Sequence, residues 1–324
     1  MAILSVKDLH THFFTRQGVV KAVNGVSFDL EPMTILGIMG ESGSGKTVTA
    51  LSILRLVPYP GRIVAGEVYF DGKDLMRLDK EELRQIRGRH IAMIFQDATT
   101  SLDAIMSIGE QVTEEITSHL PVSKREARRL TIDVLRQAGL PDPERVFSQY
   151  PFQLSGGMCQ RVMIAMAMAL DPGVLIADEP TSALDVTIQA EILTEIKKLR
   201  DIRHSSVILI SHDLGVIVGT ADVVAVMYGG SVVEYGSVLD IFNVPTHPYT
   251  VALLQSLPRL DRADGTLMTM RGSPPSLLNL SDECTFLSRC NKARNECRSE
   301  PRPELKAIAP DHLVACYNPV IHER

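Results

Sequence analysis

The sequence predicts an α/β fold with a parallel sheet, and three observations support this prediction. The apolar run 35–39, a glycine-rich stretch and a mostly apolar helix expected from Thr47 to Val57 follow one another as strand, loop and helix. Three further apolar runs end in polar side chains, as the strands of a parallel sheet do at a ligand-binding edge. Residues 104–150 carry only helical patterns, which indicates a helical insertion between two strands of one sheet.

The glycine-rich stretch fits the spacing G-x-x-x-x-G-K-[ST] of a phosphate-binding loop. Its glycines let consecutive backbone N–H groups turn toward a phosphate, and the following helix N-terminus adds partial positive charge. In this pattern Lys46 reaches the β- and γ-phosphates of a nucleotide, and the Thr47 hydroxyl holds Mg²⁺. The predicted nucleotide-binding residues are Gly40, Glu41, Ser42, Gly43, Ser44, Gly45, Lys46 and Thr47. A simple glycine-rich turn is the alternative, which the flanking strand and helix disfavour.

The composition is that of an ordinary soluble globular protein with one large or two modest domains. The 324 residues are 45% hydrophobic and 22% charged. A formal net charge of −6 and the lack of a Lys/Arg block weigh against nucleic acid as a partner. The N-terminus lacks the pattern of a signal peptide, and the longest apolar run, 162–170, is too short to span a bilayer. We therefore expect no membrane-spanning segment.

Three short strands are expected in the first 30 residues, at 3–6, 19–23 and 26–30. Two aromatic residues, Phe13 and Phe14, lie between the first two of them. An aromatic ring in this place could stack on the face of an adenine, a contact that suits any base. Ordinary core packing is the alternative for both rings.

Local signals place several turns and helix starts. An Asp-Gly turn predicts a hairpin within 66–74, and a Gly-Gly turn predicts another within 223–234. Capping-box patterns open helices at 79–82 and 123–126. A further helix is expected from Val186 to about Leu199.

Polar side chains follow the other three predicted buried strands. Gln96 is a weak signal by itself, since an amide satisfied within its loop is as good an interpretation as a ligand contact. Of the acidic pair, Asp178 can hold Mg²⁺ through water, and Glu179 can orient or deprotonate a water that attacks a γ-phosphate. A merely solvated acidic pair is the alternative. His212 could donate to a γ-phosphate, although a lone histidine at a strand end is more often structural.

A second anion site is indicated by Ser155, Gly156 and Gly157, which precede an apolar helix expected over 162–170. A serine and two glycines at a helix start leave backbone N–H groups open to an anion. A capped helix start with a glycine turn is the alternative. Cys159 lies in this helix start, far from the other cysteines, and we interpret it as structural.

In this order, the segments resemble the ATP-binding cassette of ABC transporters over about residues 1–258. The resemblance implies an ABC-type P-loop NTPase fold with a RecA-like core, a β-subdomain and a helical subdomain at about 98–172. It also implies an ATPase that uses ATP and Mg²⁺. The resemblance also implies a role for each matching residue. On the nucleotide side, Phe13 stacks on the adenine, Thr47, Gln96 and Asp178 bind Mg²⁺, Glu179 is the catalytic base and His212 is the switch histidine. Toward the partners, Gln96 senses Mg²⁺ and the membrane subunits, Ser155, Gly156 and Gly157 cap the γ-phosphate held by a partner cassette, and Asp185 lies at the interface.

The stretch 246–250, with leucines at 253, 254 and 257, resembles the dipeptide/oligopeptide branch of ABC importers, as does Met158-Cys-Gln-Arg. This branch usually carries Ser-Leu-Asn-Pro after the glutamine loop. Residues 101–104 read Ser-Leu-Asp-Ala instead, so the contact with the membrane subunits is expected to differ locally.

The resemblance implies an importer of di- or oligopeptides, with nickel or oligosaccharides as alternative cargo. It implies a second, paralogous cassette in a heterodimer, two transmembrane permease subunits and an extracytoplasmic substrate-binding protein. The chain would then lie on the cytoplasmic face of the inner membrane as a peripheral subunit. A soluble cassette ATPase acting on nucleic acid or ribosomes is the rival function, but such proteins usually carry a long coiled coil or two cassettes.

The tail from 259 to 324 is a small Pro-rich, Cys-rich extension that carries Cys284, Cys290, Cys297 and Cys316. The same branch has such a tail, and in some members it holds a 4Fe–4S cluster. Four thiolates suit that cluster or structural Zn²⁺, although the spacing lacks the tight C-x₂-C knuckle typical of zinc. A tail without metal is the third alternative. Disulfides are not expected in a reducing cytoplasm, so metal–thiolate bonds would be the natural staple.

Overall fold

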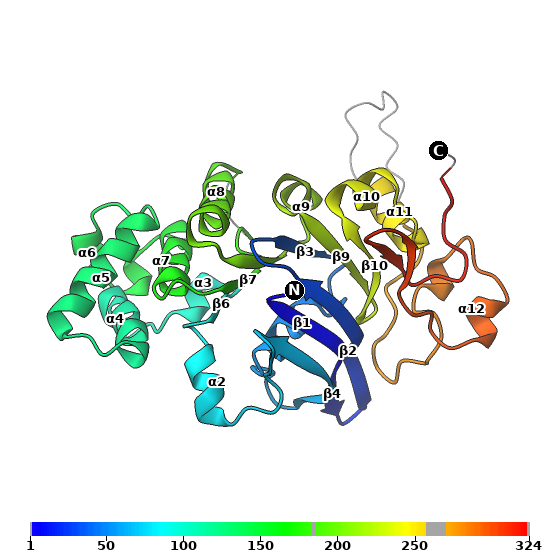
Figure 1. The fold of residues 1–324 in the computed structure, drawn as a ribbon, viewed down its shortest axis with the longest axis horizontal. Helices are drawn as coiled ribbons and strands as arrows, with labels where there is room; N and C mark the ends of the chain where they lie inside the picture. The colour runs from blue at the N-terminus through cyan, green and yellow to red at the C-terminus, as the bar shows by residue number, and fades with distance from the viewer. Residues whose placement is uncertain (1, 183–185, 257–269, 323–324) are drawn as a thin grey trace. The chain divides into compact units, whose positions relative to one another are not determined.

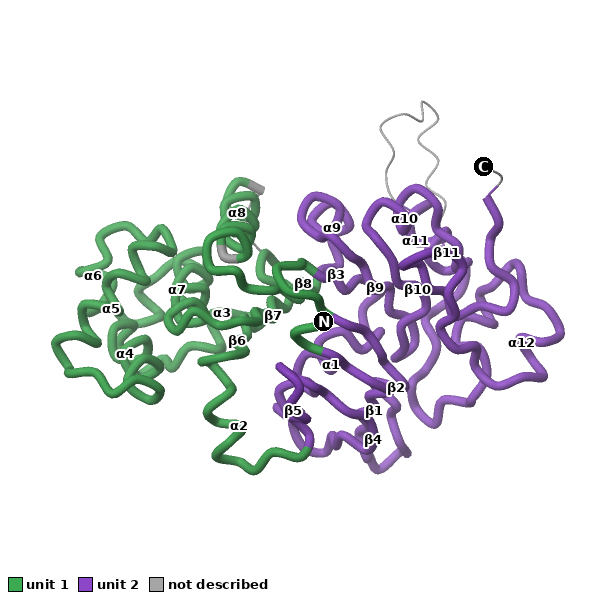
Figure 2. The backbone as a smooth tube through the Cα atoms, viewed as in Figure 1, with its two compact units in different colours: residues 1–4, 30–35, 77–210 green, residues 5–29, 36–76, 211–324 purple. Residues whose placement is uncertain are grey.

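The computed structural model describes residues 2–182, 186–256 and 270–322 (Figure 1). Helices and strands are interspersed along the chain, as the α/β prediction requires. The chain divides into two compact units, coloured separately in Figure 2. Unit 1 comprises 1–4, 30–35 and 77–210, and unit 2 comprises 5–29, 36–76 and 211–324. Within the described ranges, no helix has the length and apolar character needed to cross a membrane.

Unit 1 contains three parallel strands in the spatial order β8–β7–β6. Their bounds are Ile91–Ile94 for β6, Val174–Asp178 for β7 and Ser206–Ile210 for β8. Every residue of β7 and β8 is buried, which explains why both read as continuous apolar runs and not as alternating ones. Val174 lies opposite both Ile91 and Ser206, so the acidic pair of β7 comes at the carboxyl edge of the three strands.

In the described part of unit 1 the other main elements are helices, as predicted for the segment between β6 and β7. The helices are α2 (Lys80–Ile86), α3 (Ala98–Ser101), α4 (Ile108–His119), α5 (Lys124–Gln137), α6 (Pro143–Phe147), the 3₁₀ turn η1 (Pro151–Gln153), α7 (Gly156–Met168) and α8 (Val186–Arg203). Asp79 opens α2 with a complete capping box, and the Ser123 side chain accepts the Glu126 N–H at α5. Both predicted helix starts are therefore confirmed.

Unit 2 begins with a four-stranded sheet in the order β2–β1–β4–β5, in which β4 and β5 are antiparallel. Its strands are β1 (Leu4–Thr15), β2 (Gly18–Leu30), β4 (Gly61–Phe70) and β5 (Lys73–Asp74). The prediction of three short strands was wrong, because the polar residues that seemed to interrupt them occupy the less buried positions of two long strands. Phe13 and Phe14 accordingly lie within β1. The Asp71–Gly72 hairpin turn is confirmed, with positive φ at both residues.

A second group of strands in unit 2 has the order β11–β12–β10–β9–β3. The strands are β3 (Ile35–Met39), β9 (Val223–Tyr228), β10 (Ser231–Ser237), β11 (Lys306–Ala309) and β12 (His312–Val314). The hairpin turn at Gly229 and Gly230 is confirmed, with φ of 56° and 83°. The extension adds β12 to the edge of β10, which the sequence did not predict.

The helices of unit 2 are α1 (Lys46–Ile53), α9 (Leu214–Thr220), α10 (Val238–Asn243), α11 (Pro248–Gln255), the 3₁₀ turn η2 (Leu287–Arg289) and α12 (Glu296–Ser299). α1 ends before Val57, the predicted end. Arg55 adopts a left-handed φ of 52°, which is incompatible with a continuing helix.

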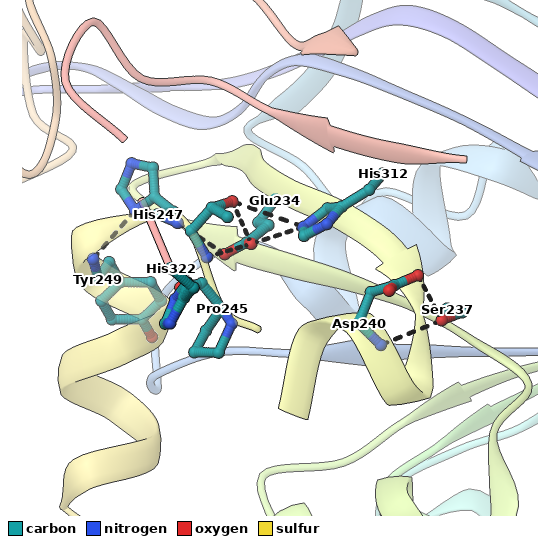
Figure 3. A network of polar contacts seen from close by, with 9 residues as sticks. Glu234, Ser237, Asp240, Pro245, His247, Tyr249, His312 and His322 are labelled. Carbon is teal, nitrogen blue, oxygen red and sulfur yellow. Dashed lines mark hydrogen bonds and ion pairs between the residues drawn. The ribbon is translucent and has the colours of Figure 1, made fainter. Parts of the chain in front are cut away.

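A buried carboxylate joins the extension to the rest of unit 2 (Figure 3). Glu234 on β10 is fully enclosed, and its Oε1 accepts from the Thr246 N–H at 2.7 Å and from the Thr246 Oγ1 at 2.6 Å. The same oxygen lies 2.8 Å from Nε2 of His312 on β12, and Oε2 accepts the His247 N–H at 3.0 Å. Burial alone would raise the pKa of Glu234, but these hydrogen bonds outweigh it and leave the pKa lowered.

Candidate functional site

The glycine-rich loop between β3 and α1 needs its glycines for steric reasons. Gly40 and Gly45 have φ of 153° and 101°, in the left-handed half of conformational space. A Cβ atom at Gly40 would lie 2.1 Å from the Met227 carbonyl oxygen, and one at Gly45 would lie 2.3 Å from that of Ala22. Neither position accepts a side chain, so glycine is required at both.

Two polar side chains of the loop fit a phosphate ligand. Lys46 is nearly buried, and its Nζ donates to the carbonyl oxygens of Gly40 at 2.8 Å and Glu41 at 3.1 Å. The buried Ser44 Oγ has no hydrogen-bond partner among the described residues. A buried hydroxyl without a partner is unfavourable, and a phosphate oxygen could accept from it. The loop therefore offers donors of the kind that the motif predicts.

Residues from distant segments hold Glu41, the second residue of the loop. Its backbone N–H donates to the Tyr249 hydroxyl at 2.9 Å, and its carboxylate pairs with Arg289 at 2.8 Å. Arg289 also donates to the Tyr228 hydroxyl at 3.2 Å. Burial raises the pKa of both tyrosines, so both hydroxyls stay protonated. Sequence reasoning missed these three supporting residues, because nothing local marks a buried arginine 248 positions away.

In unit 1 the structure brings Gln96 and Glu179 together. The Gln96 Nε2 donates to Oε2 of Glu179 at 3.3 Å, and the Ser182 hydroxyl donates to the Gln96 carbonyl at 3.2 Å. Asp178, the preceding residue, is buried. Glu179 has a left-handed φ of 48°, a strained conformation that is often found at functional sites. Its N–H donates to the Ile210 carbonyl at 2.9 Å, which helps to hold that conformation.

The three predicted residues of the second anion site form the start of α7. Ser155 is the N-cap, and its hydroxyl accepts the Met158 N–H at 3.3 Å. Gly156 is exposed, and a Cβ placed on it would meet nothing within 4 Å. Gly157 follows in the first turn. Cys159 is buried, with its thiol 3.6 Å from the Pro151 carbonyl oxygen, and burial raises its thiol pKa, as expected of a structural residue.

The other predicted residues have different surroundings. Phe13 is half-buried, and a Cβ at Gly61 would lie 2.7 Å from its ring, so part of the ring packs within unit 2. Phe14 is 46% exposed, with the Arg62 guanidinium 5.8 Å from its ring centroid. His212 is exposed and follows β8 in the chain. Asp185 lies outside the described residues.

The four cysteines of the extension line one small pocket, the four-cysteine pocket, formed by Cys284, Cys290, Cys297 and Cys316 together with His247 and Phe286. Burial, and then the neighbouring thiols, raise the pKa of Cys284 and of Cys316, to about 11 for Cys316. Among the described residues, however, no three His, Cys, Asp or Glu side chains are arranged to hold a metal ion. In the described part of the chain, the four thiols are thus not positioned as the ligands of the expected metal centre.

A buried strand, a glycine loop with left-handed glycines and a helix that begins with lysine define a P-loop nucleotide-binding protein. Sequence comparison is more specific. The family described as ABC transporter matches residues 23–182, and the one described as oligopeptide/dipeptide transporter, C-terminal region, matches residues 233–297.

Several relatives match nearly the whole chain. A probable peptide ABC transporter ATP-binding protein of Sinorhizobium fredii is 48% identical over 97% of this chain and 94% of its own. The dipeptide transport ATP-binding protein DppD of Bacillus subtilis is 46% identical, with the same two coverages. The oligopeptide transport ATP-binding protein OppD of Escherichia coli is 44% identical over 98% of this chain and 94% of its own.

A solved dimeric structure of a bacterial ABC transporter cassette superposes with a TM-score of 0.66 at 29% identity, covering 72% of this chain and 98% of that one. The chain belongs to the ABC transporter family, in the oligopeptide/dipeptide branch of its ATP-binding subunits. It is an ATPase with the ABC cassette fold, as the resemblance implied.

Proposed function

We propose that the chain powers the import of di- or oligopeptides by binding and hydrolysing ATP. The observation that carries this proposal is the near-full-length identity of 44–48% to peptide-transport ATP-binding proteins, extension included. The match of residues 233–297 to the oligopeptide/dipeptide C-terminal region supports the same cargo. Nickel and oligosaccharides are the alternative cargoes.

In the proposed mechanism, ATP binds between two cassettes. The loop Gly40–Thr47 of this chain would hold the phosphates, and Thr47, Gln96 and Asp178 would bind Mg²⁺. Gln96 also senses the membrane subunits, Phe13 stacks on the adenine, and His212 contacts the γ-phosphate. Glu179 is the base that positions the attacking water, and its contact with Gln96 supports a shared role in the site. Closure of the cassettes drives the membrane subunits, and hydrolysis resets them.

The partner cassette would complete the site. We propose that Ser155, Gly156 and Gly157 cap the γ-phosphate of the ATP on a paralogous second cassette, with Asp185 at the interface. The exposed start of α7 supports this role, and the dimeric structure of a related cassette supports pairing. Two permeases and a substrate-binding protein complete the transporter, and the chain lies peripherally on the cytoplasmic face of the membrane. Isolation of the complex with two copies of this chain and no second cassette would contradict the heterodimer.

We place the cassette at residues 1–258, with a helical subdomain at about 98–172, and the Cys-rich extension at 259–324. The run of helices α3 to α7 supports the helical subdomain. The boundary at 258–259 lies outside the described residues.

A transport assay tests the proposed function. The transporter is reconstituted in liposomes with the second cassette, the permeases and the binding protein, and ATP hydrolysis is measured with a dipeptide, an oligopeptide, nickel or an oligosaccharide. We expect a peptide to stimulate hydrolysis. Glu179→Gln should bind ATP but lose nearly all stimulated turnover, because water positioning carries the chemistry. If only nickel or only an oligosaccharide stimulated hydrolysis, that compound and not a peptide would be the cargo. If Glu179→Gln hydrolysed ATP at the parental rate, Glu179 would not be the catalytic base.

We further propose that Cys284, Cys290, Cys297 and Cys316 hold a 4Fe–4S cluster, with Zn²⁺ as the alternative. All four thiols line one pocket, and four thiolates are the donor set of both metal centres, which supports the proposal. Because no three of the described side chains are arranged as metal ligands, binding would require the thiols to move together. The group would act as a structural staple. Anaerobic purification should yield about four irons and four labile sulfides per chain, and Cys290→Ser should lose them. If the purified chain held one zinc ion, the site would be a zinc site and not an iron–sulfur cluster. If it held no metal, both proposals would be wrong.

A further inference from the structure

We propose that Arg289 positions the phosphate-binding loop for MgATP, so that the C-terminal extension sets the affinity for nucleotide. The proposal deepens the proposed function, because it assigns a controlling residue to the same ATP site. Arg289 ends the turn η2 of the extension, and Glu41 is the second residue of the loop. The two are joined by an ion pair of 2.8 Å between Nη1 and Oε2.

This ion pair is sheltered from solvent. The Arg289 side chain is only 5% exposed, and the Glu41 side chain 24%. Solvent screening is weak for such a pair, so the contact is stronger than an exposed surface ion pair. The guanidinium is oriented by two further bonds, to the Tyr228 hydroxyl at 3.2 Å and to the Arg271 carbonyl at 3.0 Å.

Both the backbone and the side chain of Glu41 are therefore held. Tyr249 accepts its N–H, and Arg289 holds its carboxylate. The Glu41 carbonyl is one of two that bond Lys46, the residue expected to reach the phosphates. Holding Glu41 therefore sets the position from which Lys46 turns to the nucleotide.

Charge gives Arg289 a second effect. Glu41 is the one carboxylate within the loop 40–47, and a carboxylate repels the phosphates that the loop has to bind. Arg289 neutralises it from the side of the extension. Without Arg289, an uncompensated negative charge would remain on the phosphate-binding loop, and its repulsion of the phosphates is an effect that a purely structural contact would not produce.

The same turn connects this contact to the four-cysteine pocket. Cys290 follows Arg289 directly, and both Cys290 and Phe286 line that pocket. The Phe286 ring packs against Tyr228 and Tyr249, with centroids 5.2 and 5.6 Å away. A change in the pocket thus displaces the turn that carries Arg289 and the ring that supports its partners. The state of the pocket is in this way coupled to the phosphate loop.

A double-mutant cycle tests the charge argument. A fluorescent MgATP analogue is titrated into the full-length purified chain and into the Arg289→Gln, Glu41→Gln and double variants, and the dissociation constant of each is measured. Arg298→Gln is the matched control, since it removes an exposed arginine of the same extension. Chemical unfolding of each variant verifies that it is folded.

Arg289→Gln should weaken MgATP binding about tenfold, which corresponds to about 1.4 kcal/mol. The double variant should return to within about threefold of the parent, because the uncompensated charge is gone. Glu41→Gln loses the ion pair but leaves no uncompensated carboxylate, so it should weaken binding less than Arg289→Gln does, by about threefold at most. Arg298→Gln should bind like the parent. Unchanged affinity in Arg289→Gln, or a double variant as weak as Arg289→Gln, would overturn the proposal. The titration needs neither cargo nor permeases, so a failure of the peptide assignment leaves it intact.

The coupling to the pocket has its own test. The substitution Cys290→Ser is made in the parent and in Arg289→Gln, and the fluorescent MgATP analogue is titrated into each. We expect about threefold weaker binding in the parent and no further loss in Arg289→Gln, because the effect passes through the arginine. Equal losses in both backgrounds, or none in the parent, would show that the pocket does not act through Arg289.

Discussion

Two carboxylates of unit 2, Glu234 and Glu41, are each held by a basic residue of the extension, but they differ in enclosure. Glu234 is fully buried and meets His312, Thr246 and the N–H of His247. The Glu41 side chain keeps 24% of its surface exposed and lies in the glycine-rich loop proposed to bind nucleotide. The first contact is closed within the protein, whereas the second borders the proposed ligand site.

This difference in enclosure separates two roles of the extension. An enclosed charge network contributes to folding, because each of its partners would be left unsatisfied if one were removed. A charge pair beside a ligand site acts on binding, because its balance determines what the ligand meets. We therefore expect variants at Glu234 to change stability and variants at Arg289 to change affinity.

The largest effect is expected from removal of the enclosed carboxylate. Glu234→Ala leaves the Thr246 and His247 donors and His312 without their acceptor, and should cost about 3–5 kcal/mol of unfolding free energy. Urea denaturation of the purified chain measures this loss. Glu300→Ala, at an exposed position of the extension, is the control and should change stability by about 0.5 kcal/mol at most. A Glu234→Ala variant as stable as this control would contradict the anchoring role.

The second largest effect is expected from acid, which should weaken the buried contacts around Glu234 and His247. Burial lowers the pKa of His247 to about 4 from its usual 6.5, so the unfolded chain binds the extra proton between these values. Stability is then full above about pH 6.5, and about 3 kcal/mol is lost as the pH falls to about 4. The lowered pKa of Glu234 acts in the same direction, since its contribution is lost as the pH falls through that pKa.

His247→Asn checks this origin. Asparagine keeps an acceptor for the Tyr249 N–H at the start of α11 but does not titrate in this range. Urea midpoints compared at pH 7 and pH 4.5 should fall less in the variant than in the parent. An equal fall would assign the acid sensitivity to other groups.

A smaller effect is expected from salt, and only at the second carboxylate. Arg289→Gln removes the guanidinium that shelters the partly exposed Glu41 carboxylate, so salt can screen the charge that is left. The affinity loss should therefore shrink from about tenfold to about threefold in about 0.5 M salt. Titration of the fluorescent nucleotide at two ionic strengths measures it, with the parent as reference for the general salt effect. A loss that does not respond to salt would mean that Arg289 acts by packing alone.

What the sequence could predict follows local chemistry. The loop Gly40–Thr47, the capped starts of α2 and α5 and the turn at Gly229 are encoded by neighbouring residues, and the structure contains all of them. The pairing of Gln96 with Glu179 was not stated in advance, but both residues were singled out.

The contacts of the extension were beyond local reasoning. β12 joins β10 across about 80 residues, and Arg289 meets Glu41 across 248. Such pairings depend on which sheet edge is open and which buried charge needs a partner, and no short pattern records either. The two long strands β1 and β2 were missed for a related reason, since they pair with each other and β1 also pairs with β4.

The most direct test of the two roles is a parallel measurement of MgATP affinity and unfolding free energy in Arg289→Gln and His312→Gln. The two variants remove the two basic residues with which the extension holds Glu41 and Glu234. We predict that Arg289→Gln weakens MgATP binding about tenfold with a modest loss of stability, and that His312→Gln lowers stability while its affinity stays parental. If both variants lost affinity in proportion to stability, the extension would act only as a structural support, and the assignment of Arg289 to nucleotide binding would be wrong.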